Sequence, residues 1–213
     1  MKICGITRPA DAELAAALGA SAVGMVLWAG SPRAVGLDAA REIAAAVPRG
    51  VTIVGVLVDP TAAEVAAVVE GVPVDALQVY GGGLPAGLRG GSVRVIRAVP
   101  VGDGGDTGAV EVNAIPPDVL VLLDARDDRR IGGTGRRIDW HAAARLARQR
   151  PIVLAGGLQP SNVAAAIGIV EPYAVDVSSG VESAPGVKDR GRLEQFFERV
   201  TAAAGPVPRG LFA

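Results

Sequence analysis

Two residues with clear chemical potential lie in, or directly after, short apolar runs. Cys4 is the only cysteine in the chain and lies within the first run, while Asp124 follows the apolar residues 119–123. An ionised thiol can act as a general base, and a carboxyl group desolvated on one side keeps its proton to higher pH, which suits a general acid. Each residue also has a structural interpretation, because free cysteine packs as a small hydrophobe and aspartate commonly caps a loop. Their chemistry therefore depends on whether the fold brings them to one site.

Other segments carry residues suited to binding anions. Arg33 follows Ser31 and Pro32, which restrain the backbone before it, and a guanidinium can bind a carboxylate through two hydrogen bonds. Two small-residue loops, at residues 156–157 and 178–180, allow a phosphate to approach backbone N–H groups. The second loop is expected to lead into a short extra helix near Val181; the alternative is that the glycines only form tight turns. The candidate phosphate-binding residues are Gly156, Gly157, Ser179 and Gly180.

Short apolar runs alternate along the chain with alanine-rich stretches. Continuous β-branched runs, such as residues 51–58, are typical of parallel strands buried on both faces. Glycine-rich residues 81–91 and the segment 101–117 predict weak or missing helices after the fourth and fifth strands. Thr7 and Asp139 are the expected N-caps of the first and fourth helices. Strands are expected at residues 2–4, 22–27, 51–58, 74–79, 93–99, 119–124, 152–155 and 174–178, and helices at 7–18, 37–47, 62–70, 140–149, 161–167 and 189–204.

This order of elements predicts an α/β fold, a closed (βα)8 or TIM barrel. The 213 residues could instead form two small domains, but composition does not shift between the halves, so one domain is expected at residues 1–204 with a tail at 205–213. A doubly wound open sheet is the alternative, but the sequence lacks the G-x-G-x-x-G motif expected after the first strand of such a fold. In a barrel the carboxyl ends of the strands meet at one mouth. Cys4, Arg33, Asp124 and the two small-residue loops are therefore expected to converge there.

The bulk composition excludes several other classes. Lys and Arg total 21 against 22 Asp and Glu, without blocks of like charge, so neither a nucleic-acid nor a membrane-surface partner is expected. No apolar run approaches the ~18 residues of a membrane span, and a single cysteine cannot form an internal disulfide, which favours the cytoplasm. A single histidine, His141, excludes a site with two imidazole ligands, and it is expected to be a surface or packing residue of its helix and not a catalyst.

Longer motifs occur in order along the chain. They are KICGIT at residues 2–7, SPR at 31–33, LLDA at 122–125, GGTG at 132–135 followed by DW at 139–140, LAGGL at 154–158 with Pro160 and NV at 162–163, and VDVSSGVE at 175–182 with PG at 185–186 and KD at 188–189. In these motifs the chain resembles the phosphoribosylanthranilate isomerase family. The resemblance covers residues 1 to about 200, and its first and last motifs are specific among phosphate-binding barrels.

The resemblance implies a TIM barrel that performs an Amadori rearrangement in tryptophan biosynthesis. N-(5-phosphoribosyl)anthranilate would become 1-(2-carboxyphenylamino)-1-deoxyribulose 5-phosphate without a metal or organic cofactor. Asp124 would protonate the furanose oxygen, and Cys4 would remove the proton from the second sugar carbon. Arg33 would hold the anthranilate carboxylate, and Asp176 would support the ring nitrogen region. Gly156, Gly157, Ser179 and Gly180 would bind the phosphate, the loop at 132–135 would close over the substrate, and the protein would be a monomer or homodimer.

One departure from the family pattern leaves alternatives open. The family usually has Gln-Leu-His-Gly after the fourth strand, whereas this chain has Gln78, Val79, Tyr80 and Gly81. A phenol therefore replaces an imidazole in the wall of the site, with a very different pKa. The alternatives are an isomerase with a different or broader aminoaldose phosphate substrate, and a phosphosugar-binding barrel without catalysis. Cys4, Asp124 and Arg33 argue against the second, because binding alone does not require all three.

Overall fold

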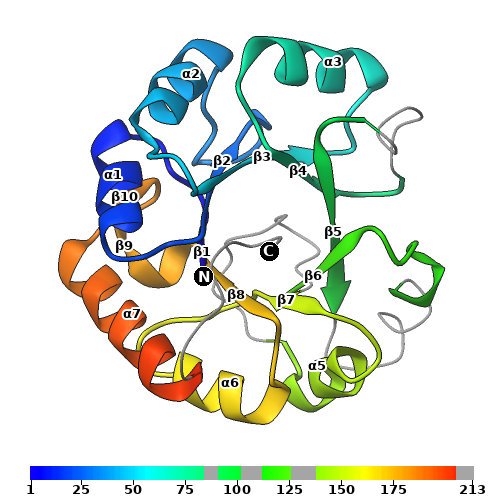
Figure 1. The fold of residues 1–213 in the computed structure, drawn as a ribbon, viewed down its shortest axis with the longest axis vertical. Coiled ribbons are helices and arrows are strands. Elements are labelled where there is room, and N and C mark those ends of the chain that lie inside the picture. Colours follow the sequence, from blue (N-terminus) through cyan, green and yellow to red (C-terminus); the bar gives the residue numbers. More distant parts are fainter. Residues whose placement is uncertain (84–90, 102–111, 126–137, 205–213) are drawn as a thin grey trace.

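The computed structural model describes residues 1–83, 91–101, 112–125 and 138–204, which form a closed barrel of eight parallel strands with helices outside it (Figure 1). The strands follow chain order, and pairing of β1 with β8 closes the ring. The bounds are β1 Lys2–Ile3, β2 Ala22–Val26, β3 Thr52–Val58, β4 Ala76–Tyr80, β5 Arg94–Val101, β6 Leu120–Ala125, β7 Ile152–Leu154 and β8 Ala174–Val177. The predicted (βα)8 fold is thereby confirmed.

The helices form the outer ring. They are α1 Pro9–Ala17, α2 Leu37–Ala46, α3 Ala62–Gly71, α5 Trp140–Ala147, α6 Val163–Val170 and α7 Arg190–Ala204. The described residues between β4 and β5 contain no helix, as the glycine-rich segment predicts, and residues 112–114, which begin the described range before β6, are helical. No helix in the described part of the chain is long and apolar enough to cross a membrane. The expected tail at 205–213 lies outside the described residues.

Alternation along each strand separates the barrel interior from the layer between sheet and helices. One set of side chains points into the barrel, and the intervening residues pack beneath the helices. The interior apolar set is Cys4, Ala22, Val54, Val56, Ala76, Ile96, Ala98, Leu122, Val153 and Ala155. Most of these side chains are small or β-branched, and the ring of Tyr80 packs against them. Toward the carboxyl ends of the strands the interior positions become polar.

The ends of the helices differ in part from expectation. Asp139 caps α5 as predicted, because its side chain accepts hydrogen bonds from the backbone N–H groups of His141 and Ala142. The prediction that Thr7 caps α1 is wrong. Arg8 holds the N-cap position, and the Thr7 hydroxyl donates to the carbonyl oxygen of Gly186 at 2.5 Å. Thr7 therefore joins β1 to the last hairpin, β9 Glu182–Ala184 and β10 Val187–Lys188. Tertiary contact outweighs local capping here.

Candidate active site

A cavity at the carboxyl ends of the strands contains most of the residues expected to do chemistry. Cys4, directly after β1, and Asp124 of β6 both line it, although the two residues are only 7% and 6% exposed. Arg33, Asp176, Gly156, Gly157 and Ser179 also line it, whereas Gly180 does not. The other lining residues are Val26, Trp28, Ser31, Val56, Val58, Tyr80, Ala155, Leu158, Val177 and Ser178. The thiol of Cys4, the carboxyl group of Asp124 and the guanidinium of Arg33 therefore line one cavity.

Asp124 is held at both of its oxygens. The backbone N–H of Ala125 donates to Oδ1 at 2.8 Å, and the Tyr80 hydroxyl donates to Oδ2 at 2.8 Å. Burial raises the pKa of Asp124 above its ordinary value, while these two hydrogen bonds act in the opposite direction because they stabilise the carboxylate. A carboxyl group whose pKa is raised in this way holds its proton closer to neutral pH, as general acid catalysis needs.

Cys4 lies over a buried ion pair. The Lys2 Nζ donates to Asp176 Oδ1 at 3.0 Å, and Lys2 itself is 0% exposed. A Cβ atom placed on Gly24 would lie 3.0 Å from Cys4 Sγ and 3.1 Å from Lys2 Nζ, so the bare glycine provides the space that both side chains occupy. Burial raises the pKa of the Cys4 thiol, and the Lys2 ammonium is the main group that opposes this rise. Lys2 therefore favours the thiolate in an otherwise unfavourable place.

The Lys2–Asp176 pair yields a prediction about stability. Lys2→Met leaves Asp176 buried without its cation, and we expect the free energy of unfolding to fall by about 3–5 kcal/mol. Urea unfolding of the wild type, Lys2→Met and the double variant Lys2→Met/Asp176→Leu measures this. The double variant should recover much of the loss, because both charges are gone. A single variant as stable as the wild type would show that the pair contributes little.

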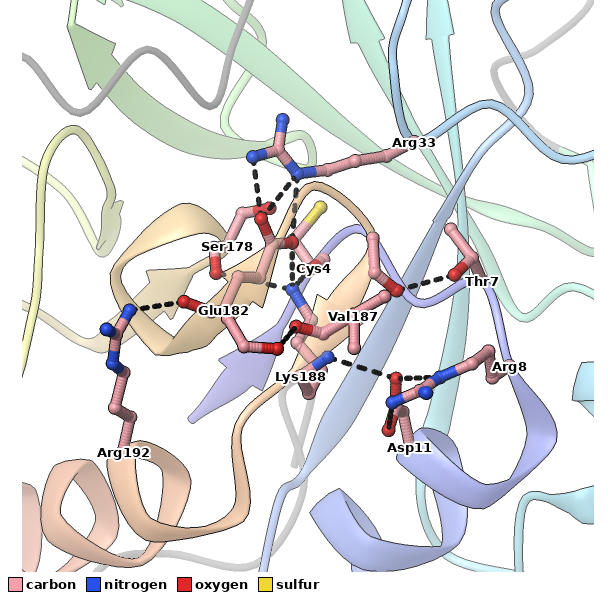
Figure 2. A network of polar contacts seen from close by, with 12 residues as sticks. Cys4, Thr7, Arg8, Asp11, Arg33, Ser178, Glu182, Val187, Lys188 and Arg192 are labelled. Carbon is pink, nitrogen blue, oxygen red and sulfur yellow. Dashed lines mark hydrogen bonds and ion pairs between the residues drawn. The ribbon is translucent and has the colours of Figure 1, made fainter.

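Arg33 is buried against Glu182. Its Nε donates to Glu182 Oε1 and Oε2 at 2.9 and 3.1 Å, and its Nη2 donates to Oε2 at 2.7 Å. Figure 2 shows Glu182 between Arg33 and Lys188, with the third guanidinium nitrogen, Nη1, pointing away from the carboxylate. Burial would raise the pKa of Glu182, but the hydrogen bonds from Arg33 and the ammonium of Lys188 hold it below its ordinary value. Glu182 therefore stays ionised and fixes one edge of the guanidinium.

Lys188 ties this ion-pair network to the base of the cavity. Its Nζ donates to the backbone oxygen of Cys4 at 2.6 Å, to that of Ser178 at 3.2 Å and to Glu182 Oε1 at 2.7 Å (Figure 2). The hairpin of β9 and β10 thereby fixes the ends of β1 and β8 from outside the barrel. Sequence reasoning did not assign roles to Glu182 or Lys188, although both lie in the motifs at the end of the chain. The signal that could have indicated this pair is two opposite charges, Glu182 and Lys188, six residues apart on either side of a Pro-Gly turn.

The two small-residue loops lie against each other. Gly156 and Gly157 have positive φ angles of 82° and 64°, a conformation that favours glycine. Gly180 approaches the first loop so closely that an added Cβ would lie 1.9 Å from the carbonyl oxygen of Leu158. The short extra helix expected near Val181 is present as the 3-10 helix η1, Ser179–Val181. Gly180 thus packs closely against Leu158, whereas Gly156, Gly157 and Ser179 line the cavity.

Two other expectations concern residues away from the cavity. Of the surface and packing positions expected for His141, the structure shows the surface one on α5, and His141 is not among the cavity-lining residues. The loop at 132–135, expected to close over the substrate, lies outside the described residues. Within the described ranges, no group of three or more His, Cys, Asp and Glu side chains is placed to hold a metal ion.

Comparison with known proteins gives one consistent result. A family model described as N-(5'phosphoribosyl)anthranilate (PRA) isomerase matches residues 1–199. An N-(5'-phosphoribosyl)anthranilate isomerase of Pseudomonas fluorescens is 45% identical over 199 residues, covering 93% of this chain and 94% of the relative. The fold also superposes on monomers generated from the dimeric phosphoribosylanthranilate isomerase of Thermotoga maritima, with a TM-score of 0.81, 33% identity and coverage of 94% of this chain and 97% of that one. A phosphoribosyl anthranilate isomerase in complex with reduced 1-(o-carboxyphenylamino)-1-deoxyribulose 5-phosphate gives a TM-score of 0.80, 35% identity and the same two coverages.

Proposed function

The chain belongs to the N-(5'-phosphoribosyl)anthranilate isomerase family, and we propose that it isomerises N-(5-phosphoribosyl)anthranilate in tryptophan biosynthesis with Asp124 as general acid and Cys4 as general base. The product is 1-(2-carboxyphenylamino)-1-deoxyribulose 5-phosphate. The observation that supports these roles is that a carboxyl group with a raised pKa and a thiol beside a buried ammonium line the same cavity. The reaction is an intramolecular oxidation–reduction, so the substrate supplies both the electrons and their acceptor.

Ring opening comes first. The proton of Asp124 goes to the furanose oxygen, the bond between that oxygen and the first sugar carbon breaks, and the nitrogen lone pair forms the Schiff base. Burial of Asp124 supports this step because it favours the protonated, donating form. Its fixation by Tyr80 and Ala125 holds the carboxyl group in one place while the substrate binds.

Proton abstraction follows. The Cys4 thiolate takes the proton from the second sugar carbon, and the electrons of that C–H bond form the enolamine while neutralising the iminium nitrogen. The enolamine then becomes the ketone as its hydroxyl loses a proton and the first carbon gains one. Lys2 supports the role of Cys4, because its ammonium lowers the cost of ionising a buried thiol.

The remaining lining residues suit the two charged ends of the substrate. We assign the anthranilate carboxylate to the Nη1 edge of Arg33, since Glu182 occupies the other edge. Asp176, held by Lys2, is assigned to the nitrogen region, and Gly156, Gly157 and Ser179 to the phosphate. Gly180 supports the phosphate loop by packing on Leu158. Fixing both ends places the sugar between Cys4 and Asp124.

The proposed base also bears on where and in what form the protein works. A thiolate base must remain reduced, so the reaction belongs in a reducing compartment, and we propose the cytoplasm. The Thermotoga maritima relative is dimeric, and we keep both a monomer and a homodimer for this chain. Sedimentation velocity of the purified protein distinguishes the two.

A steady-state assay tests the function. Loss of the anthranilate-type fluorescence of N-(5-phosphoribosyl)anthranilate is followed with the wild-type protein, and the product is identified by chromatography against a standard. We expect turnover of this substrate. A protein that binds inorganic phosphate but does not consume the substrate would instead be a phosphosugar-binding barrel. Faster turnover of a different aminoaldose phosphate would indicate an isomerase of different specificity.

A further inference from the structure

A chain of polar side chains crosses the barrel interior from β4 to β6. Gln78 and Tyr80 are two residues apart on β4 and both point inward. The Gln78 Nε2 donates to the Tyr80 Oη at 3.1 Å, and the Tyr80 hydroxyl donates to Asp124 Oδ2 at 2.8 Å. Because the phenol accepts from the amide, its single proton is directed at the carboxyl group. This arrangement suits an ionised Asp124, which can only accept.

Within this series of hydrogen-bonded side chains, Gln78 Oε1 has no hydrogen-bond donor among the described residues. Gln78 is 0% exposed, and its Oε1 is a buried acceptor without a hydrogen bond among the described residues. An unpaired buried acceptor is costly and calls for an explanation. Rotating the amide by half a turn exchanges Oε1 and Nε2 with little change of shape, since the two groups are nearly the same size. Oε1 would then face Tyr80 and could accept the phenol proton.

We propose that Gln78 and Tyr80 form a two-state hydrogen-bond relay that holds Asp124 in place both before and after it donates its proton. The proposal rests on the proposed function, in which Asp124 is the general acid. With Asp124 protonated, its O–H donates to Tyr80, and Tyr80 donates to Gln78 Oε1. With Asp124 ionised, the direction reverses to the arrangement seen here. No proton leaves Tyr80 or Gln78; the phenol O–H and the amide rotate, so the relay positions the acid and does not replace it.

The surroundings of Tyr80 fit this role. Burial, with Asp124 next in importance, raises the pKa of the Tyr80 phenol well above its ordinary value, so the phenol keeps its proton at neutral pH. Cys4, directly after β1, and Asp176 on β8 act in the same direction. Lys2 on β1 is the cation that faces Asp124 from within the barrel. On the neighbouring strands, Asp59 after β3 accepts from the Gly82 N–H, and Arg97 of β5 donates to the Gly81 oxygen.

The relay predicts pKa shifts of opposite sign in two variants. Tyr80→Phe removes the donor that stabilises the Asp124 carboxylate, so the Asp124 pKa should rise. Gln78→Met keeps the Tyr80 donor but removes both the Nε2 donor to Tyr80 and the oxygen that accepts the phenol proton when Asp124 is protonated. The second loss is the larger, because it leaves the phenol proton buried without a partner, so the Asp124 pKa should fall. The measurement is a carbon-13 NMR titration of carboxyl-labelled aspartate in the intact, substrate-free protein. The Asp124 resonance is identified by its absence in Asp124→Asn.

Controls separate the relay from a structural effect. Tyr173→Phe removes the hydroxyl of the only other tyrosine, which is 41% exposed, and should leave the Asp124 titration unchanged. Tyr80→His restores a neutral side chain that can both donate and accept. It should recover most of the kcat that Tyr80→Phe loses, which we expect to be about tenfold to a hundredfold from misplacement of the acid. This comparison also covers the case in which Gln78→Met does not fold.

Shifts in the same direction, or no shift, would overturn the relay, as would a Tyr80→His variant no more active than Tyr80→Phe. The titration needs no substrate, so it reports on the relay even if the wild type does not turn over N-(5-phosphoribosyl)anthranilate. Failure of the proposed function would appear in the turnover assay alone. The two ideas can therefore fail separately.

Discussion

Asp124→Asn should lower kcat by about 10²–10⁴-fold while KM for N-(5-phosphoribosyl)anthranilate changes little. The amide cannot give a proton to the furanose oxygen, yet it is nearly the same size as the carboxyl group and its oxygen can still accept from Ala125 or Tyr80. The effect should therefore fall on the chemical step and not on binding. Steady-state kinetics, with the loss of substrate fluorescence as readout, measures it.

Asp59→Asn is the matched control for this change. Asp59 also follows a strand at the same end of the barrel, but it is exposed and does not line the cavity. Its Oδ1 accepts from the Gly82 N–H at 2.7 Å, a bond that an asparagine oxygen can keep, and its φ of 42° is tolerated by asparagine. Activity near that of the wild type is expected for Asp59→Asn. If Asp124→Asn were equally active, Asp124 would not be the acid.

Cys4→Ser should lower kcat by about 10²–10⁴-fold, the usual contribution of a positioned base. A serine hydroxyl fits the space of the thiol but does not ionise at neutral pH, so Lys2 has no thiolate to stabilise. Because Cys4 is the only cysteine, thiol titration of the unfolded variant verifies the substitution. The fluorescence assay at several pH values gives the rate.

The comparison with Cys4→Ala separates chemistry from packing. If the thiolate is the base, serine and alanine variants should be similarly slow, because neither offers an ionised group. Circular dichroism and urea unfolding check that both remain folded. A Cys4→Ser variant with wild-type kcat would return Cys4 to the role of a small buried hydrophobe.

Strand positions followed from the sequence because burial on both faces leaves a continuous apolar signal. Residues 51–58 were expected as one strand, and β3 is Thr52–Val58. The position of Asp124 at the end of such a run likewise predicted its place at the barrel mouth, since strand direction is common to all eight strands. The lack of a helix in the described residues between β4 and β5 likewise agrees with their glycine content. These predictions depend on local composition and on one global rule of the fold.

Long-range pairings could not be predicted in the same way. Arg33 and Glu182 are 149 residues apart, and no local pattern indicates that one carboxylate occupies two guanidinium nitrogens. The sequence predicted that Lys2 lies in the first strand, but not that the pairing of β1 with β8 places it opposite Asp176. The alternation of residues along β4 indicates that the Gln78 side chain points inward, but that its oxygen has no hydrogen-bond donor is known only from the folded barrel. Buried polar partners are set by register and closure.

The double variant Cys4→Ser/Asp124→Asn tests most directly whether the two residues act in successive steps of one reaction. If Asp124 opens the ring and Cys4 then removes the proton, the slower of the two impaired steps limits the overall rate. The kcat of the double variant should then be close to that of the slower single variant. Losses that multiply would contradict the account, because they would mean that the two residues contribute independently to the same step.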